Sequence, residues 1–373
     1  MSSVQQAYLR FIHDRKKDIL GEALFLVLKV LSLLFLAGWW MRKAAFRTGI
    51  LRRRRLPCPV VSVGNITTGG TGKTPLVIAL ARSFVKAGKR VAVLSRGYKG
   101  RRPLKRPLWV SDGKRILAGP MEAGDEPVLI ARKVPEAAVL VHPVRYRSGL
   151  EAIARFKPDI IILDDGFQRR FSLHRDLDLL VVDALNPFSS GWPLPAGLLR
   201  EPLTALSEAG VFVVNKADQA ANLNDLLTVL RSRNPRAFVV ESKYEPALLR
   251  DLTTGKRMNP SHLDGSPVGA LSGIAAPLSF IRTLASHKVI VRHAYNFDDH
   301  YTYTTEELRK VAEDAQRRGL EYLVTTEKDE VKFPRGLELP VPVLVFEVEW
   351  RITGGREHWE TVMKGLQLAA GGG

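Results

Sequence analysis

Cysteine is almost absent from this sequence, which has only Cys58 among 373 residues. A single cysteine excludes an intramolecular disulfide and a cysteine-based metal cage. The eight histidines are scattered and form no H-x-x-x-H pair of the kind that binds zinc. These absences agree with a cytoplasmic protein whose chemistry uses neither disulfides nor a zinc site of these types.

Acidic residues are also scarce, since 38 Asp and Glu face 56 Lys and Arg, and the net charge is +18. An excess of this size predicts an anionic partner, which could be nucleic acid, a phosphorylated metabolite or a membrane surface. Hydrophobic residues make up 45% of the chain, which excludes a disordered protein. The length predicts two domains with ample buried core.

Half of the excess charge lies in residues 1–55, where twelve basic residues face three acidic ones. Within this segment, Ala23–Met41 contains one charged residue, Lys29, and ends near Trp39 and Trp40. As a helix it would be about 28 Å long, close to the ~30 Å hydrocarbon core of a bilayer. Tryptophans are common at membrane interfaces, and seven basic residues follow in 42–55.

We therefore predict a membrane helix that either spans the bilayer or enters one leaflet. A cleaved signal peptide and a buried core helix are the alternatives, but no A-x-A site precedes the basic run. The heavier positive charge on the C-terminal side places the rest of the chain in the cytoplasm. No finger motif or aromatic-interleaved basic patch is present, so we expect no nucleic-acid partner.

After Pro57, short apolar runs alternate with longer mixed segments, a pattern typical of βαβ units and a parallel sheet. The polar stretch Leu252–Ser266 predicts a boundary between two α/β domains. We expect an N-terminal helix with a basic collar at 1–55, a P-loop core at 56–255 and a smaller α/β domain at 256–373. The predicted strands are Val60–Gly64, Val91–Leu94, Ala138–Val141, Ile160–Leu163, Leu179–Val182, Val211–Val214, Val239–Glu241, Val268–Leu271, Val289–Arg292, Tyr322–Thr325 and Val343–Val348. The predicted helices are Pro75–Ala87, Val128–Arg132, Gly149–Arg155, Ala276–Ala285 and Thr305–Arg318.

A phosphate-binding loop is predicted where the first of these strands meets the first helix. The loop contains Thr68, Gly69, Gly70, Thr71, Gly72, Lys73 and Thr74. Glycines let backbone N–H groups curve around phosphate oxygens, and the helix N-terminus adds a positive dipole. Lys73 would reach the β- and γ-phosphates and Thr74 would bind Mg²⁺. The strict P-loop pattern has glycine where Thr67 stands.

The acidic residue that completes a P-loop site is predicted at Asp164 and Asp165, which end the apolar run 160–163. Two adjacent carboxylates repel each other, so a cation such as Mg²⁺ would balance them. Asp125 and His300, taken alone, read as a helix cap and a surface-loop histidine. The segment Asn215–Asp218 fits the N-K-x-D pattern that reads guanine, but four residues are weak evidence.

Taken together, the motifs resemble one family, the tetraacyldisaccharide 4′-kinases of the lipid A pathway. They lie in one order over about residues 60–330: S-V-G-N at 62–65, G-G-T-G-K-T-P at 69–75, L-S-R-G-Y at 94–98, A-G-D-E-P at 123–127, R-Y at 145–146, L-D-D-G-F-Q at 163–168, H-R-D-L at 174–177, L-P-A-G at 194–197, L-R-E-P-L at 199–203, D-H-Y at 299–301 and T-T-E-K-D at 325–329. Threonine at 67 belongs to the family's pattern, whereas Asn215–Asp218 does not.

The resemblance implies a P-loop kinase at the cytoplasmic face of the bacterial inner membrane. Such enzymes transfer the γ-phosphoryl group of ATP to the 4′-hydroxyl of tetraacyldisaccharide 1-phosphate, which gives lipid IVA. A lipid substrate would explain the apolar helix and its basic collar, because the acyl chains stay in the bilayer. The sequence does not predict the oligomeric state or the acyl-chain lengths.

The resemblance also implies roles for individual residues. Asp125 and His300 would form a carboxylate–imidazole pair that accepts the proton of the sugar hydroxyl, with the second domain folded over the first. Five further residues are candidates for contacts to the γ-phosphate or the sugar: Arg96, Tyr98, Arg145, Arg200 and Glu201. A P-loop GTPase and a membrane-bound nucleotide sensor are the rival functions.

Overall fold

The structure of the protein is a computed structural model. It describes Tyr8, Phe11 and Ile12, and then residues 18–97, 100, 105–169 and 171–371, with the backbone alone at Arg169. Tyr98, one of the predicted substrate contacts, lies outside these residues.

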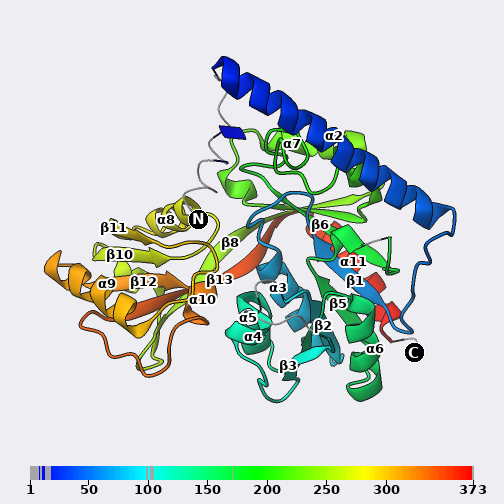
Figure 1. Cartoon of the computed structure of the whole chain (residues 1–373). Coiled ribbons are helices and arrows are strands. Elements are labelled where there is room, and N and C mark those ends of the chain that lie inside the picture. Colours follow the sequence, from blue (N-terminus) through cyan, green and yellow to red (C-terminus); the bar gives the residue numbers. More distant parts are fainter. Residues whose placement is uncertain are drawn as a thin grey trace.

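A single mixed sheet forms the centre of the molecule (Figure 1). Its strands follow the order β11-β10-β12-β13-β8-β7-β6-β1-β5-β2-β4-β3, and β9 pairs with β8. The strands from β7 to β4 in this order are parallel, and β3 is antiparallel to β4. The first seven strands are β1 (Val60–Gly64), β2 (Val91–Ser95), β3 (Leu108–Asp112), β4 (Ala138–Val141), β5 (Ile160–Asp164), β6 (Leu177–Asp183) and β7 (Val211–Asn215).

A long two-stranded ribbon connects this part of the sheet to the second group of strands. It consists of β8 (Phe238–Asp251), which starts parallel to β7, and β13 (Val343–Gly354), which pairs antiparallel with β8. The second group continues from β13 through β12, β10 and β11, all parallel. Their bounds are β9 (Arg257–Met258), β10 (Pro267–Ser272), β11 (Ile290–Asn296) and β12 (Tyr322–Thr326). The predicted division at 255/256 falls beside this ribbon and stays a prediction.

Helices cover both faces of the first group of strands. On one face, α3 (Lys73–Lys86) and α5 (Asp125–Lys133) pack over β1, β2, β4 and β5, and α11 (Arg356–Ala369) packs beside them on β8. On the other face lie α6 (Arg145–Arg155) and α7 (Leu223–Arg233). The remaining helices are α4 (Pro120–Ala123), α8 (Pro277–Ser286), α9 (Thr305–Arg317) and α10 (Glu327–Glu330). Parallel strands covered on both faces explain the unbroken Val, Ile and Leu runs.

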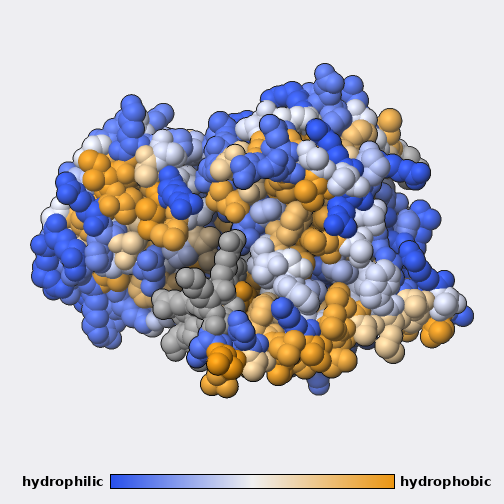
Figure 2. Space-filling model, turned by 90° about the horizontal axis from the view of Figure 1, so that it is seen from above, coloured by the Kyte–Doolittle hydropathy of each residue, from blue (hydrophilic) through white to orange (hydrophobic). Residues whose placement is uncertain are grey.

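The apolar N-terminal segment forms α2 (Ile19–Arg47), a helix longer than the predicted Ala23–Met41. Asp18 caps it by accepting a hydrogen bond from the backbone N–H of Gly21 at 2.8 Å. The helix is long and apolar enough to cross a membrane. Only 11% of its most apolar 18-residue stretch is buried against the rest of the protein, whereas the core helix of a soluble protein would be mostly buried. Figure 1 shows it along the outer edge of the molecule, and Figure 2 shows a hydrophobic band along that edge.

Candidate active site

The P-loop lies where the sequence predicted it, between the carboxyl end of β1 and the first turn of α3. Gly72 takes a left-handed backbone conformation with φ +85° immediately before the helix. A side chain at this position would also overlap the hydroxyl of Tyr244, which lies against the loop. The turn therefore requires glycine at 72 both for its backbone angle and for this close approach.

Lys73 and Arg200 converge on Asp165 beside the loop. The Lys73 ammonium lies 3.4 Å from one Asp165 oxygen, and Arg200 binds both oxygens at 2.9 and 3.0 Å. Burial alone would raise the pKa of Asp165, but the two cations outweigh it and hold the pKa well below the usual range. Arg200 also donates to Asn65 and to the carbonyl of Thr67. Charges suited to a nucleotide phosphate and its metal are thus already gathered here.

Asp164 lies next to this group and is almost fully buried at 1% exposure. Its Oδ2 accepts a hydrogen bond from Ser95 at 2.9 Å, whereas no described residue reaches its Oδ1. Burial, with Glu126 and Asp165 nearby, raises the pKa of Asp164 to about 7. A buried carboxylate with an open oxygen and a raised pKa is the environment that a bound cation would neutralise.

The oxygen atoms beside the P-loop are of the kind that binds Mg²⁺. The described residues contain no group of three or more His, Cys, Asp or Glu arranged around a metal. Mg²⁺ in kinase sites commonly takes one or two carboxylates and completes its shell with water and substrate phosphates. Asp164, Asp165 and the Thr74 hydroxyl are oxygen donors of this kind, and both Asp165 oxygens already bind Arg200.

The predicted pair of Asp125 and His300 is present as a direct contact across 175 positions of sequence. Asp125 begins α5, and His300 lies in the loop after β11. The imidazole Nδ1 lies 2.8 Å from both carboxylate oxygens, and an ionised carboxylate can only accept, so Nδ1 carries the hydrogen. Burial would raise the pKa of Asp125, but the bond from His300 and the charge of Lys328 lower it to about 2.

Lys328 is a site residue that the sequence interpretation missed. Lys328 lies in α10, which directly follows β12 of the second group of strands. Its ammonium contacts carboxylates from both parts of the molecule. The distances are 3.3 Å to Glu126, 3.4 Å to Asp299 and 3.9 Å to Asp125. The T-T-E-K-D motif was the available signal, but a lysine in a motif does not reveal which carboxylates it meets.

Replacement of Lys328 by methionine should make Asp125 harder to ionise, because the burial of that carboxyl would lose a compensating charge. The change from lysine to methionine should raise the pKa of Asp125 by about one unit. The acidic limb of the kcat–pH profile would then move to higher pH by a similar amount, and Lys328→Arg should restore most of the wild-type profile. An acidic limb unchanged in Lys328→Met would contradict this role.

The other predicted contacts have different surroundings. Arg145 is buried at 4% exposure and donates to the backbone carbonyl of Asp164 at 3.3 Å, next to the carboxylate pair. Arg96 is exposed after β2. Glu201 is buried at 3% exposure and accepts a hydrogen bond from the indole of Trp39 in α2. The structure therefore gives Glu201 an anchoring partner, and its contact with substrate stays a prediction.

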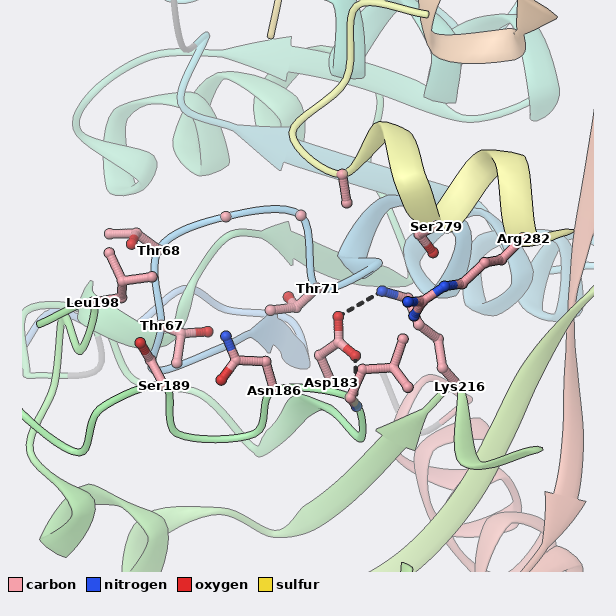
Figure 3. Close-up of a pocket in the computed structure, with 14 residues that line it drawn as sticks. Thr67, Thr68, Thr71, Asp183, Asn186, Ser189, Leu198, Lys216, Ser279 and Arg282 are labelled. Carbon is pink, nitrogen blue, oxygen red and sulfur yellow. Dashed lines mark hydrogen bonds and ion pairs between the residues drawn. The ribbon is translucent and has the colours of Figure 1, made fainter. Parts of the chain in front are cut away.

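Two cavities adjoin the P-loop. One, of about 250 Å³, lies between the loop and the second group of strands and is lined by Lys73, Thr74, Glu126, Lys328 and apolar residues of α8 and β13. The other, of about 270 Å³, lies outside the loop tip, where Lys216 forms an ion pair with Asp183 at 2.6 Å (Figure 3). In Figure 3, Ser279 and Arg282 of α8 line the side of this cavity that lies opposite Thr68 and Leu198. The first cavity therefore extends from the phosphate loop to Glu126 and Lys328, which are neighbours of Asp125.

Comparison with known proteins gives consistent matches. The family model described as tetraacyldisaccharide-1-P 4′-kinase matches residues 24–367. A tetraacyldisaccharide 4′-kinase of Anaeromyxobacter sp. strain K is 43% identical over 340 residues, covering 90% of this chain and 89% of the relative. One from Syntrophus aciditrophicus strain SB is 39% identical over 340 residues, covering 88% and 89%.

A solved structure is also similar over almost its whole length. The crystal structure of LpxK from Aquifex aeolicus in complex with ATP is 30% identical, with a TM-score of 0.74. The match covers 92% of this chain and 99% of that one. The similarity therefore includes the P-loop part, the ribbon and the second group of strands.

Proposed function

This chain belongs to the tetraacyldisaccharide-1-P 4′-kinase family, and we propose that it transfers the γ-phosphoryl group of ATP to the 4′-hydroxyl of tetraacyldisaccharide 1-phosphate. The product would be lipid IVA, an intermediate of lipid A. The observation that carries the proposal is the Asp125–His300 pair, whose neighbours Glu126 and Lys328 line the cavity beside the P-loop. In this proposal, Asp125 accepts the proton that an alcohol substrate must lose.

In this proposal, the residues divide the work of the transfer. The loop N–H groups and Lys73 bind the phosphates, and Thr74 with Asp164 and Asp165 would hold Mg²⁺. When bound, Mg²⁺ neutralises charge that develops on the transferred phosphoryl group. Asp125 stays ionised at neutral pH, and His300 fixes its orientation. A loose transition state needs little early deprotonation of the hydroxyl, so a carboxylate of low pKa is an adequate acceptor.

The experiment is incubation of the purified full chain with [γ-³²P]ATP, Mg²⁺ and the disaccharide 1-phosphate, followed by chromatography of the lipid. A labelled lipid that appears only with the acceptor supports the kinase. A GTPase would prefer GTP and hydrolyse it without acceptor, whereas a nucleotide sensor would bind ATP and label no lipid. Either of those results would overturn the proposal.

We also propose that α2 lies in the membrane interface and does not span the bilayer. Three of its side chains, at intervals of seven and four residues, bind the P-loop part. Ser32 contacts the backbone of Pro193 and Ala196 at 2.9 and 3.0 Å, Trp39 donates to Glu201, and Lys43 pairs with Glu208 at 2.5 Å. A spanning helix would carry these partners into hydrocarbon or break the bonds. Leucines on other sides of the helix are exposed, which suits one leaflet of the inner membrane.

The double substitution Leu31→Glu and Leu34→Glu should move the protein from the membrane fraction to the soluble fraction. Both side chains are exposed, at 44% and 64%, so the change spares the packed face of α2. The measurement is sedimentation with vesicles of bacterial lipid. Leu150→Glu, on the exposed side of α6, is the matched control and should leave binding unchanged. Equal binding of the double variant and the wild type would contradict the interfacial role.

A further inference from the structure

Asn215, the first residue of the N-K-x-D segment, contacts the P-loop in the structure. Asn215 ends β7 and is fully buried. Its amide nitrogen donates to the carbonyl of Thr71 at 2.9 Å and to the hydroxyl of Tyr244 at 2.8 Å, and it lies 3.4 Å from the carbonyl of Gly72. The side chain thus joins β7 to the last turn of the loop before the helix.

The other end of the same amide binds the long ribbon. The Asn215 carbonyl accepts hydrogen bonds from the Ser242 hydroxyl and, at 3.1 Å, from the Trp350 indole. Ser242 belongs to β8 and Trp350 to β13, where Trp350 stands directly opposite Tyr244. Asn215 is therefore a junction between the phosphate loop and the two strands that carry the second part of the molecule.

Tyr244 makes the contact with the loop tighter. Its hydroxyl donates to the carbonyl of Gly72 at 3.2 Å, in the space that a side chain at 72 would occupy. Burial raises the pKa of Tyr244, so the phenol remains a protonated donor. Two donors from outside the loop, one amide and one phenol, therefore hold the carbonyls of Thr71 and Gly72.

The positions of these two carbonyls also fix the directions of the backbone N–H groups of Gly72 and Lys73. In a trans peptide the C=O and the following N–H point in opposite directions. The carbonyls of Thr71 and Gly72 face Asn215 and Tyr244, so the N–H groups of Gly72 and Lys73 face the other way. A P-loop binds phosphate through backbone N–H groups in this part of the loop.

We infer that Asn215 and Tyr244 are positioning residues that hold the P-loop in its phosphate-binding shape from the β8–β13 ribbon, and that Asn215–Asp218 does not select guanine. The amide hydrogens and the carbonyl of Asn215 are already engaged by protein groups. Lys216 is paired with Asp183, and Asp218 is exposed. The inference concerns nucleotide binding and does not depend on the identity of the lipid acceptor.

The test compares Asn215→Asp and Tyr244→Phe with the control Asp218→Asn. In Asn215→Asp an oxygen replaces the donor that faces the Thr71 carbonyl, so the Kd for MgATP should rise about 10-fold or more. Tyr244→Phe keeps the ring and should raise the Kd about 3-fold or more. Asp218→Asn should leave both the affinity and the ratio of ATP to GTP affinities unchanged.

Calorimetric titration of the full chain with MgATP measures these values without any acceptor, so the outcome is separate from that of the kinase assay. Where activity is measured, the KM for ATP should rise in the two variants more than kcat falls. If Asn215→Asp does not fold, Tyr244→Phe decides, and a wild-type Kd in that variant overturns the inference. A 10-fold change of the ATP to GTP ratio in Asp218→Asn would also overturn it, because the segment would then read the base.

Discussion

Replacing Lys73 by alanine is expected to lower kcat for phosphoryl transfer by about 10³-fold or more. The ammonium is held 3.4 Å from Asp165 and 3.3 Å from the Asn65 amide oxygen, at the start of α3 where the phosphates would lie. Because the Lys73 ammonium is in position before the reaction, no reorganisation is needed when the transition state forms. Its removal should therefore mainly reduce the stabilisation of charge on the transferred phosphoryl group. The transfer rate with labelled ATP measures this loss.

The structure provides a matched control for Lys73 on the same helix. Lys86 lies exposed in the last turn of α3, so Lys86→Ala removes an equal charge without touching the loop. Asp165 keeps its two bonds to Arg200 when Lys73 is removed, and we expect both variants to fold with similar melting temperatures. A transfer rate in Lys73→Ala equal to that of Lys86→Ala would contradict the P-loop assignment.

The parallel part of the sheet was predictable because its strands are buried on both faces. Apolar runs such as Val60–Gly64 and Ile160–Leu163 stand out from their surroundings, and the structure confirms these strands within one residue, with β5 ending at Asp164. The edge strand β3 and the helices α7 and α11 were missed, since each is partly exposed and its sequence mixes polar and apolar residues. The ribbon was predicted too short, although Phe346–Ile352 alternates in the manner of a half-exposed strand.

The site was predictable where function depends on neighbours in sequence. The P-loop and the acidic end of β5 each form one continuous segment, and the family resemblance that joined them to His300 is confirmed by the match over residues 24–367. The contacts of Lys328, Tyr244 and Ser95 could not be read in this way. Each depends on how distant elements pack, and its partners lie between 29 and 203 positions away.

Replacing Asp125 by asparagine should lower kcat by about 10²-fold or more while the KM for ATP changes little. Asparagine keeps the size of the side chain and can still accept a hydrogen bond from His300, so the loss isolates the charge and the proton acceptor. Glu122→Gln, in the exposed part of α4, is the matched control for the loss of a carboxylate. Unchanged turnover in Asp125→Asn would remove the assignment of Asp125 as the acceptor.

The combination of Asp125→Asn with His300→Ala tests whether the two residues act as one unit. Residues that act together are strongly non-additive, so the double variant should be no slower than the slower single variant within about 3-fold. Multiplicative losses would mean that His300 acts on its own, for example through Asp299, which lies 3.5 Å from its Nε2. Because His300 comes from the second group of strands and Asp125 from the first, a non-additive result would also mean that the catalytic unit exists only when the two parts of the molecule meet.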